Sequence, residues 1–298
     1  MSVSAAVVKE LRDKTGAGMM DCKKALAETN GDLEKAIDFL RQKGLAAAAK
    51  KADRVAAEGV AAVVLSDAGT EGVVLELNCE TDFVAKTDEY RQIAETLAKK
   101  ALESKAASVD ALLNTAAGDG KTVGDIVKEA VAKMGENIQV RRFERATGDV
   151  LAAYIHGGGK IGVLVSGKGP ATDAARNALK DVAMQVAAAR PLAVVREDIA
   201  QDVLIREKEI FSAQAAESGK PANIIEKMVE GRIQKFYAES CLVEQVYIKD
   251  PAGKQTVAAY LKSVDAGLAV TGFTRFEVGE GIQKKETDFA AEVQAQLA

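Results

Sequence analysis

Several residue types are scarce in this 298-residue chain, and their scarcity excludes whole classes of protein. Histidine occurs once, at His156, and the three cysteines, Cys22, Cys79 and Cys241, lie far apart. One histidine and three scattered cysteines cannot supply a zinc site with the ordinary number of ligands. An odd number of cysteines without a Cys-x-x-Cys pair argues against a disulfide framework and fits a reducing cytosol. We therefore expect no bound metal and no structural disulfide.

Long apolar runs and a basic excess are also missing. No apolar run is long enough to span a bilayer, and the N-terminal residues lack the basic start and apolar block of a secretory signal. We therefore expect a cytoplasmic protein without a membrane partner. The net charge of −4 argues against direct nucleic-acid binding. Residues 1–54 are nevertheless net basic; this bias suits docking on an acidic protein surface, or reflects solvated helix faces.

The composition that remains is that of an ordinary folded protein, with 48% hydrophobic and 28% charged residues. Its length allows two or three domains. Residues 4–43 predict three short helices, with Ser4 and Asp32 as N-caps and an end at Gly44. An Ala- and Lys-rich stretch over 45–58 predicts a helical connector.

An internal repeat follows, in which strand, turn, strand and helix occur twice in the same order. The two copies are Gly59–Leu65, Gly72–Asn78 and a helix to Leu102, then Asp149–Ile155, Ile161–Ser166 and a helix over Thr172–Ala189. Glycine-rich turns between the strands suit hairpins. Between the copies, a helix is predicted over Val123–Met134 and a strand over Ile138–Phe143. The pattern predicts an α+β fold with two similar subdomains and antiparallel sheets.

Two long helical patterns after the second copy are separated by Ser218-Gly219-Lys220-Pro221 and predict an antiparallel helical hairpin. The remaining elements are predicted as a strand over Val243–Ile248, a short helix over Thr256–Leu261, a strand over Thr271–Val278 and a helix over Thr287–Leu297. We expect the chain to divide into 1–54 (three helices and connector), 55–145 (first subdomain), 146–190 (second subdomain, first part), 191–225 (hairpin), 226–278 (return to the second subdomain) and 279–298 (C-terminal module).

One stretch, from Glu76 to Lys86, places an acidic residue, Asp82, next to a large aromatic residue, Phe83. The pair lies where a predicted strand ends and a predicted helix begins. A β-branched apolar run ends there, and Thr81 or Asp82 can cap the helix that follows. Corners of this kind are held rigidly by the elements on either side and often carry function. The alternative is a capping Asp82 and a Phe83 buried in the core.

Motifs for nucleotide chemistry fail on their context. Gly157 to Gly162 matches Gly-x-Gly-x-x-Gly, but it joins two strands instead of opening a helix. Gly120-Lys121-Thr122 imitates the end of a phosphate loop, yet Thr115 stands where that loop requires glycine. An enzyme alternative would combine Cys79, His156 and Asp82 as a triad, although a cysteine at the end of a buried strand is usually inert.

The Glu76–Lys86 stretch, Glu-Leu-Asn-Cys-Glu-Thr-Asp-Phe-Val-Ala-Lys, resembles the signature of the elongation factor Ts family. A second family-like run extends from Leu11 to Leu26, in the family's order and at the family's separation. Further family-like stretches are 133–138, 227–232 and 272–281. The resemblance covers essentially the whole chain.

The resemblance implies a guanine-nucleotide exchange factor of elongation factor Tu, a protein that performs no covalent chemistry and is therefore not an enzyme. It implies an N-terminal ubiquitin-associated-like domain, a core of two α+β subdomains, an inserted coiled-coil hairpin and a C-terminal helical module. The hairpin is linked to self-association in some members. The C-terminal module and the second N-terminal helix touch the partner's nucleotide-binding domain. No cofactor is implied.

The family's functional positions can be carried over to matching residues. The resemblance implies that Asp82 and Phe83, flanked by Thr81 and Val84, enter the partner near its magnesium site and promote GDP release. Secondary contacts with the partner are implied for Met19, Met20, Lys23, Met134, Gly135 and His156. Met134 stands where some members carry isoleucine. One of the two N-terminal methionines could instead fill the core, and a rival hypothesis gives residues 1–54 alone the binding function.

Overall fold

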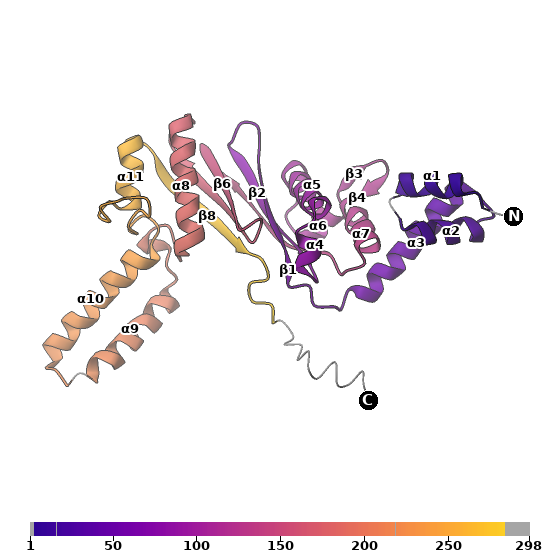
Figure 1. Ribbon diagram of the computed structural model, residues 1–298. Helices are drawn as coiled ribbons and strands as arrows, with labels where there is room; N and C mark the ends of the chain where they lie inside the picture. The colour runs from indigo at the N-terminus through magenta and orange to yellow at the C-terminus, as the bar shows by residue number, and fades with distance from the viewer. Residues whose placement is uncertain (1–2, 16, 218, 284–298) are drawn as a thin grey trace.

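Four layers make up the centre of the molecule, in which two antiparallel sheets pack face to face and helices cover the outer face of each (Figure 1). The computed structural model describes residues 3–15, 17–217 and 219–283. A three-helix unit lies at one end of the elongated molecule and a helical hairpin at the other. The expected α+β class with antiparallel sheets is confirmed.

The N-terminal unit folds around a small core that includes Val8, Leu11 and Leu26. Its helices are α1 (Ala5–Thr15), α2 (Met19–Glu28) and α3 (Leu33–Lys51). The expected end at Gly44 is wrong, because α3 continues into the Ala- and Lys-rich stretch. A β-carbon on Gly44 would lie 3.3 Å from that of Ala132, so the glycine serves close helix packing.

The first subdomain has a sheet of strand order β1-β2-β5, with four helices on its outer face. Its elements are β1 (Glu58–Leu65), β2 (Glu71–Cys79), α4 (Asp82–Ala85), α5 (Asp88–Ser104), α6 (Val109–Leu113), β3 (Ala116–Gly118), β4 (Lys121–Thr122), α7 (Val123–Met134) and β5 (Gln139–Thr147). Strand β2 is buried on both faces: Leu75 points to the helices and Val74 to the second sheet. Sequence patterns did not predict α6 or the β3–β4 hairpin.

One predicted helix of the first subdomain is two helices in the structure. The pattern gave a single helix from the corner to Leu102, whereas α4 ends at Ala85 and α5 begins at Asp88. The reason is a second N-cap, since the Thr87 side chain accepts a hydrogen bond from Tyr90 N at 3.3 Å. Thr81 therefore caps only the short α4.

The second subdomain repeats the plan with strand order β6-β7-β8. Its elements are β6 (Val150–His156), β7 (Ile161–Lys168), α8 (Asp173–Ala189), α11 (Val257–Val264) and β8 (Ala269–Glu277). Val163, Leu179 and Val182 belong to its core, which α8 and α11 close. The predicted strand–strand–helix repeat is thus present in both halves.

A buried carboxylate lies between the two sheets. Glu76 is fully buried and accepts hydrogen bonds from Arg142 Nε at 2.6 Å, Arg141 Nη1 at 3.0 Å and Gly279 N at 2.8 Å. Burial alone would raise the pKa of Glu76, but the Gly279 N–H and the two guanidinium groups hold it below its ordinary value. Breaking a buried pair of this kind is strongly destabilising.

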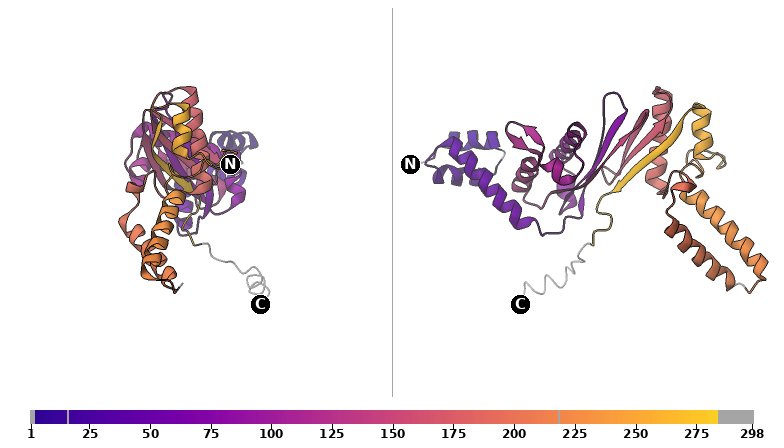
Figure 2. Two further views of the ribbon diagram at one scale, coloured as in Figure 1. Left: turned by 90° about the vertical axis from the view of Figure 1, so that its left-hand side faces the viewer. Right: turned by 180° about the vertical axis from the view of Figure 1, so that it is seen from behind.

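The helical hairpin consists of α9 (Gln201–Ala216) and α10 (Ala222–Ser240), preceded by the 3-10 helix η1 (Arg196–Asp198), and projects away from the sheets (Figure 2). Residue 225, the expected hairpin boundary, lies inside α10. The helix predicted over Thr287–Leu297, and with it most of the C-terminal module, lies outside the described residues. Among the helices of the described part, none is long and apolar enough to cross a membrane.

The strand predicted over Val243–Ile248 is wrong. This segment forms turns with an isolated bridge between Val246 and Thr256. Its backbone pairs only irregularly with residues 255–258, as where Tyr247 N donates to Gln255 O at 2.8 Å. A side-chain amide satisfies other backbone groups: Gln185 Nε2 donates to Val246 O at 3.1 Å, and Ile248 N donates to Gln185 Oε1 at 2.8 Å. The apolar alternation therefore reflects packing on α8, without sheet formation.

Candidate functional site

The corner after β2 is built from local hydrogen bonds. Strand β2 ends at Cys79, and Thr81 adopts the extended backbone of an N-cap residue. The Thr81 hydroxyl accepts from Val84 N at 3.4 Å and so begins α4. The corner thus presents a four-residue helix whose first two residues are Asp82 and Phe83.

Phe83 points away from the protein, with 80% of its surface exposed. The alternative of a core phenylalanine is therefore wrong. The neighbours on the same short helix anchor it, since Ala85 is buried and Val84 packs against the core of the first subdomain. An exposed aromatic on an anchored helix is the kind of side chain that supplies a large share of binding energy at an interface.

Asp82 lies in the first turn of α4 beside Phe83 and does not cap the helix, since Thr81 does. Its Oδ2 accepts from Lys86 Nζ at 2.5 Å, one turn further along. This hydrogen bond lowers the pKa of Asp82, and the charge of Lys160 contributes to the same shift. Asp82 therefore carries a negative charge at neutral pH on an accessible corner.

A second turn, at the end of α7, is bound to this corner. Glu136 Oε2 accepts from Glu80 N and Thr81 N, each at 3.0 Å, and Glu136 Oε1 accepts from the Thr81 hydroxyl at 2.5 Å. The turn is made by Gly135, whose φ of 79° lies in the left-handed region that favours glycine. Met134 and Gly135 thus lie beside the corner.

Sequence reasoning missed Glu136 and Glu80 as members of this site. Two features of the sequence could have pointed to them. A polar residue directly after a helix-ending glycine lies on a tight turn, and Glu80 directly precedes a predicted N-cap. Neither feature reveals that the two turns meet, because 56 positions separate the two glutamates.

His156 ends β6 and is exposed, with Nδ1 3.0 Å from the Tyr154 hydroxyl. The turn after it docks on the first subdomain, where Ala61 N donates to Gly159 O at 2.7 Å and Lys160 pairs with Glu58. Because Glu58 lies opposite Cys79 in the β1–β2 pair, this turn lies at the same end of the core as the corner.

Met19, Met20 and Lys23 form a separate exposed group on α2 of the N-terminal unit. The two methionines are 54% and 75% exposed, so the expectation that one of them fills the core is wrong. The buried residues of α2 are Cys22, Ala25 and Leu26. The unit is held to the first subdomain where α3 packs on α7 (Figure 1).

The residues of the supposed triad have other partners. Cys79 is buried, its Sγ donates to Thr81 O at 3.2 Å, and burial raises the pKa of its thiol to about 11. Asp82 pairs with Lys86, and His156 with Tyr154. A thiol that stays protonated and has no histidine as its partner cannot act as the activated nucleophile of a triad.

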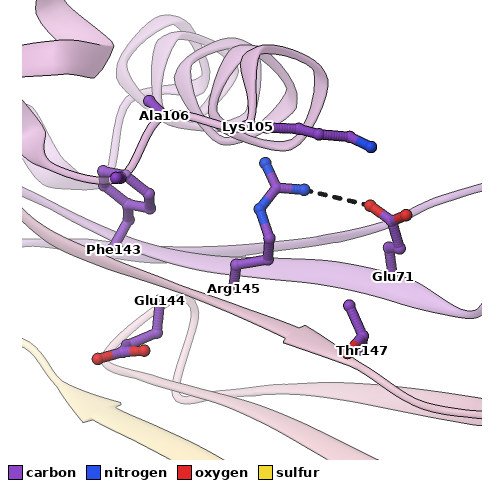
Figure 3. Close-up of a pocket in the computed structure, with 8 residues that line it drawn as sticks. Glu71, Lys105, Ala106, Phe143, Glu144, Arg145 and Thr147 are labelled. Atoms are coloured by element: carbon purple, nitrogen blue, oxygen red, sulfur yellow. Dashed lines mark hydrogen bonds and ion pairs between the residues drawn. The ribbon is translucent and has the colours of Figure 1, made fainter.

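The hollow shown in Figure 3 has a volume of about 550 Å³ and lies at the end of β2 opposite the corner. Arg145 occupies its centre and pairs with Glu71 at 3.2 Å. The same guanidinium donates to the carbonyls of Ala101 and Leu102 and so satisfies the last turn of α5. Arg145 and Glu71 therefore serve the fold, and their polar groups are already paired within the protein.

Comparison with known proteins gives a consistent result. The family model described as Elongation factor TS matches residues 80–280. Elongation factor Ts of Halothermothrix orenii is 48% identical over 300 residues, covering 100% of this chain and 99% of the relative. Elongation factor Ts of a Clostridium botulinum type A strain is 49% identical over 304 residues, covering 99% and 98%. The matches extend over the three-helix unit, both subdomains and the hairpin, and the chain therefore belongs to the elongation factor Ts family.

Proposed function

We propose that the protein is the guanine-nucleotide exchange factor of elongation factor Tu, acting in the cytoplasm without covalent chemistry of its own. Family membership supports this general role. The observation that carries the proposal on this chain is the 80% exposure of Phe83 on an anchored corner helix, next to the charged Asp82. A side chain so exposed contributes little to the core and is available to a partner.

The proposed mechanism is differential binding. The exchange factor binds nucleotide-free elongation factor Tu more tightly than the GDP form. By reciprocity, it lowers the affinity of elongation factor Tu for GDP by the same ratio. Mg²⁺ demands near-octahedral ligands at about 2.0–2.1 Å, so a displacement of about an ångström in the partner removes coordination. Phe83 supplies the rigid wedge, and Asp82 brings negative charge to the region where the partner gathers its magnesium ligands.

The other site residues have supporting roles in this proposal. Met19, Met20 and Lys23 dock the N-terminal unit on the partner and raise affinity. On the core, the exposed Gly135 and His156 and the half-buried Met134, which also packs on the first subdomain, border the wedge. Self-association through the α9–α10 hairpin is a further proposed property, and we propose no direct nucleic-acid partner. In the rival hypothesis, in which residues 1–54 alone bind, the core is a spacer; recovery of a GTPase by residues 55–298 from cytosol would argue against it.

Phe83→Ala should slow factor-promoted GDP release by the equivalent of about 1–3 kcal/mol, which is typical of an aromatic side chain that becomes buried at an interface. Its melting temperature should stay near that of the parent, because an exposed side chain has little packing to lose. Release of a fluorescent GDP analogue from elongation factor Tu measures the first effect and a thermal melt the second.

Leu192→Ala is the matched control, since Leu192 is another large apolar side chain with 61% exposure. It lies beyond α8, in the second subdomain, and should exchange like the parent. If Phe83→Ala accelerates release as well as Leu192→Ala does, the wedge is disproved. Asp82→Ala should reduce exchange in the same direction as Phe83→Ala.

A further inference from the structure

Two glutamates tie the corner helix to the end of α7 in both directions. The Glu136 carboxylate accepts two backbone N–H groups and the Thr81 hydroxyl from the corner. In return, Glu80 Oε1 accepts from Asn137 N at 2.6 Å. We call these residues, Glu80, Thr81, Glu136 and Asn137, the corner clamp. Hydrogen bonds with an ionised acceptor are the strong ones, and the clamp has four.

The clamp matters because α4 is too short to hold itself. A four-residue helix fixes several dihedral angles for very few internal hydrogen bonds and is unstable alone. Its start depends on the Thr81 hydroxyl, which accepts from Val84 N and donates to Glu136 Oε1. The orientation of Thr81, and with it the direction in which Phe83 points, is therefore set from outside the helix.

Asn137 extends the clamp to the N-terminal unit. Its Nδ2 donates to the carbonyl oxygens of Ala52 at 3.2 Å and Arg54 at 2.8 Å, on the connector after α3. The Asn137 side chain is buried, so these contacts are shielded from water. The connector from the N-terminal unit, the end of α7 and the start of α4 are thus joined at one point.

We propose that Glu136 is a positioning residue for nucleotide exchange, which fixes α4 so that Phe83 meets the partner in a single orientation. This inference rests on the proposed function of the corner. Glu136 itself is partly buried and touches Thr81, so it acts through Phe83 and not by its own contact with nucleotide. Without the clamp, Phe83 is still present but its side chain no longer has a fixed orientation. Small misplacements of a functional group reduce reaction rates strongly.

The test measures GDP release from elongation factor Tu at increasing concentrations of the factor, which separates the rate at saturation from affinity. Glu136→Ala is expected to lower the saturating rate roughly tenfold, because aiming is lost. Affinity for nucleotide-free elongation factor Tu, set largely by other surfaces, should change by less than about threefold. Glu136→Gln keeps an amide oxygen that can accept from the two N–H groups. Its saturating rate of GDP release should therefore lie between those of Glu136→Ala and the parent.

A double-mutant cycle decides whether Glu136 acts through Phe83. If it does, Phe83→Ala/Glu136→Ala should release GDP within about twofold of Phe83→Ala alone. Additive losses would overturn the proposal, as would a Glu136→Ala variant with a normal saturating rate. If Phe83→Ala itself behaves like the parent, the proposed function fails first, and the two failures remain distinguishable.

Asp250→Ala is the matched structural control. Its carboxylate also accepts backbone N–H groups in a turn, from Ala252, Lys254 and Gln255, but it lies in the second subdomain. It should leave the saturating rate unchanged. If Glu136→Ala fails to fold, Thr81→Val removes the hydroxyl end of the same contact and should lower the saturating rate in the same way; a normal rate for folded Thr81→Val would overturn the proposal.

Discussion

The two subdomains share a plan but differ at the point where the second strand ends. In both, a hairpin of two strands leads to a 17-residue helix, α5 in the first and α8 in the second, capped by Thr87 and Thr172 respectively. Both helices finish on a residue with left-handed backbone, Lys105 and Arg190. In the first subdomain alone, the short helix α4 stands between strand and long helix.

The difference shows how one copy of a common plan comes to expose the residues of the proposed site. In the second subdomain, β7 ends at Lys168 and α8 begins at Asp173, leaving room only for a brief turn. In the first, the longer connection holds an anchored helix that exposes Phe83. The scaffold supplies rigidity in both copies, and the short helix exposes a large aromatic side chain in one.

The largest expected difference between the copies lies where an extra residue in an edge strand, Arg141 in β5 or Thr271 in β8, bulges opposite the middle strand of the sheet. The register shifts at Glu76 in β2 and at Ser166 in β7. Glu76→Ala should destabilise the protein by about 3–5 kcal/mol, because Arg141 and Arg142 lose their buried partner. Ser166→Ala removes a hydroxyl that donates to Gly272 O at 3.3 Å and should cost about 0.5–1.5 kcal/mol.

Urea unfolding at several pH values would measure this difference. The pKa of Glu76 is lower in the folded protein than its ordinary value of 4.5, so its contribution is present above that pH. As the pH falls below about 4.5, the unfolded chain takes up the proton first, and the contribution is progressively lost. Glu76→Ala should therefore flatten the acid limb of stability against pH, and Ser166→Ala should not. Equal costs for the two variants would contradict the assignment of Glu76 as the joint between the sheets.

Removing the N-caps of α5 and α8 should destabilise the protein less than Glu76→Ala does, and by equal amounts. Thr87 accepts from Tyr90 N at 3.3 Å, and Thr172 accepts from Ala175 N at 3.2 Å. Thr87→Ala and Thr172→Ala should each destabilise the protein by about 1 kcal/mol, as loss of an N-cap does. Chemical denaturation of both variants would test whether the scaffold helices are equivalent. A cost confined to one of them would show that the other is held by packing alone.

The smallest effect on exchange is expected from shortening the hairpin of the second subdomain. Its base is packed by Val203, Leu204, Phe236 and Tyr237 around Cys241. Replacing 207–232 by a short Gly/Ser linker keeps this base. GDP release should stay within about twofold of the parent, since the removed part is remote from the corner (Figure 2). A large loss of exchange would mean that the binding features are shared between the copies.

Much of this architecture could be predicted because it follows from periodicity and capping. Helix α7 has the predicted bounds, Val123–Met134, because the Thr122 and Asp125 side chains form a capping box at one end and Gly135 ends the other. Strand β2 was recognisable from its β-branched apolar run. The corner was placed correctly for the same reason, since a strand, a cap and a helix meet there.

What failed depends on contacts between segments far apart in the sequence. The Val243–Ile248 segment has the residue types of a strand, but its backbone pairs only at an isolated bridge, and the Gln185 side chain of α8 takes part of its hydrogen bonds. The exposure of Phe83 could not be derived from residue type, which favours burial. The corner clamp was missed because Glu136 and Thr81 are brought together only by the folded sheet.

Gly279 has a consequence for how the chain is threaded. Its φ is 75°, and a β-carbon there would lie 2.2 Å from the Ala57 carbonyl oxygen, so the stretch leaving β8 runs directly against the stretch entering β1. The core is therefore a closed loop of chain whose entrance and exit touch. Such a unit suits transplantation as a cassette or circular permutation, because its two ends could be joined or reopened elsewhere with little rearrangement of the sheets.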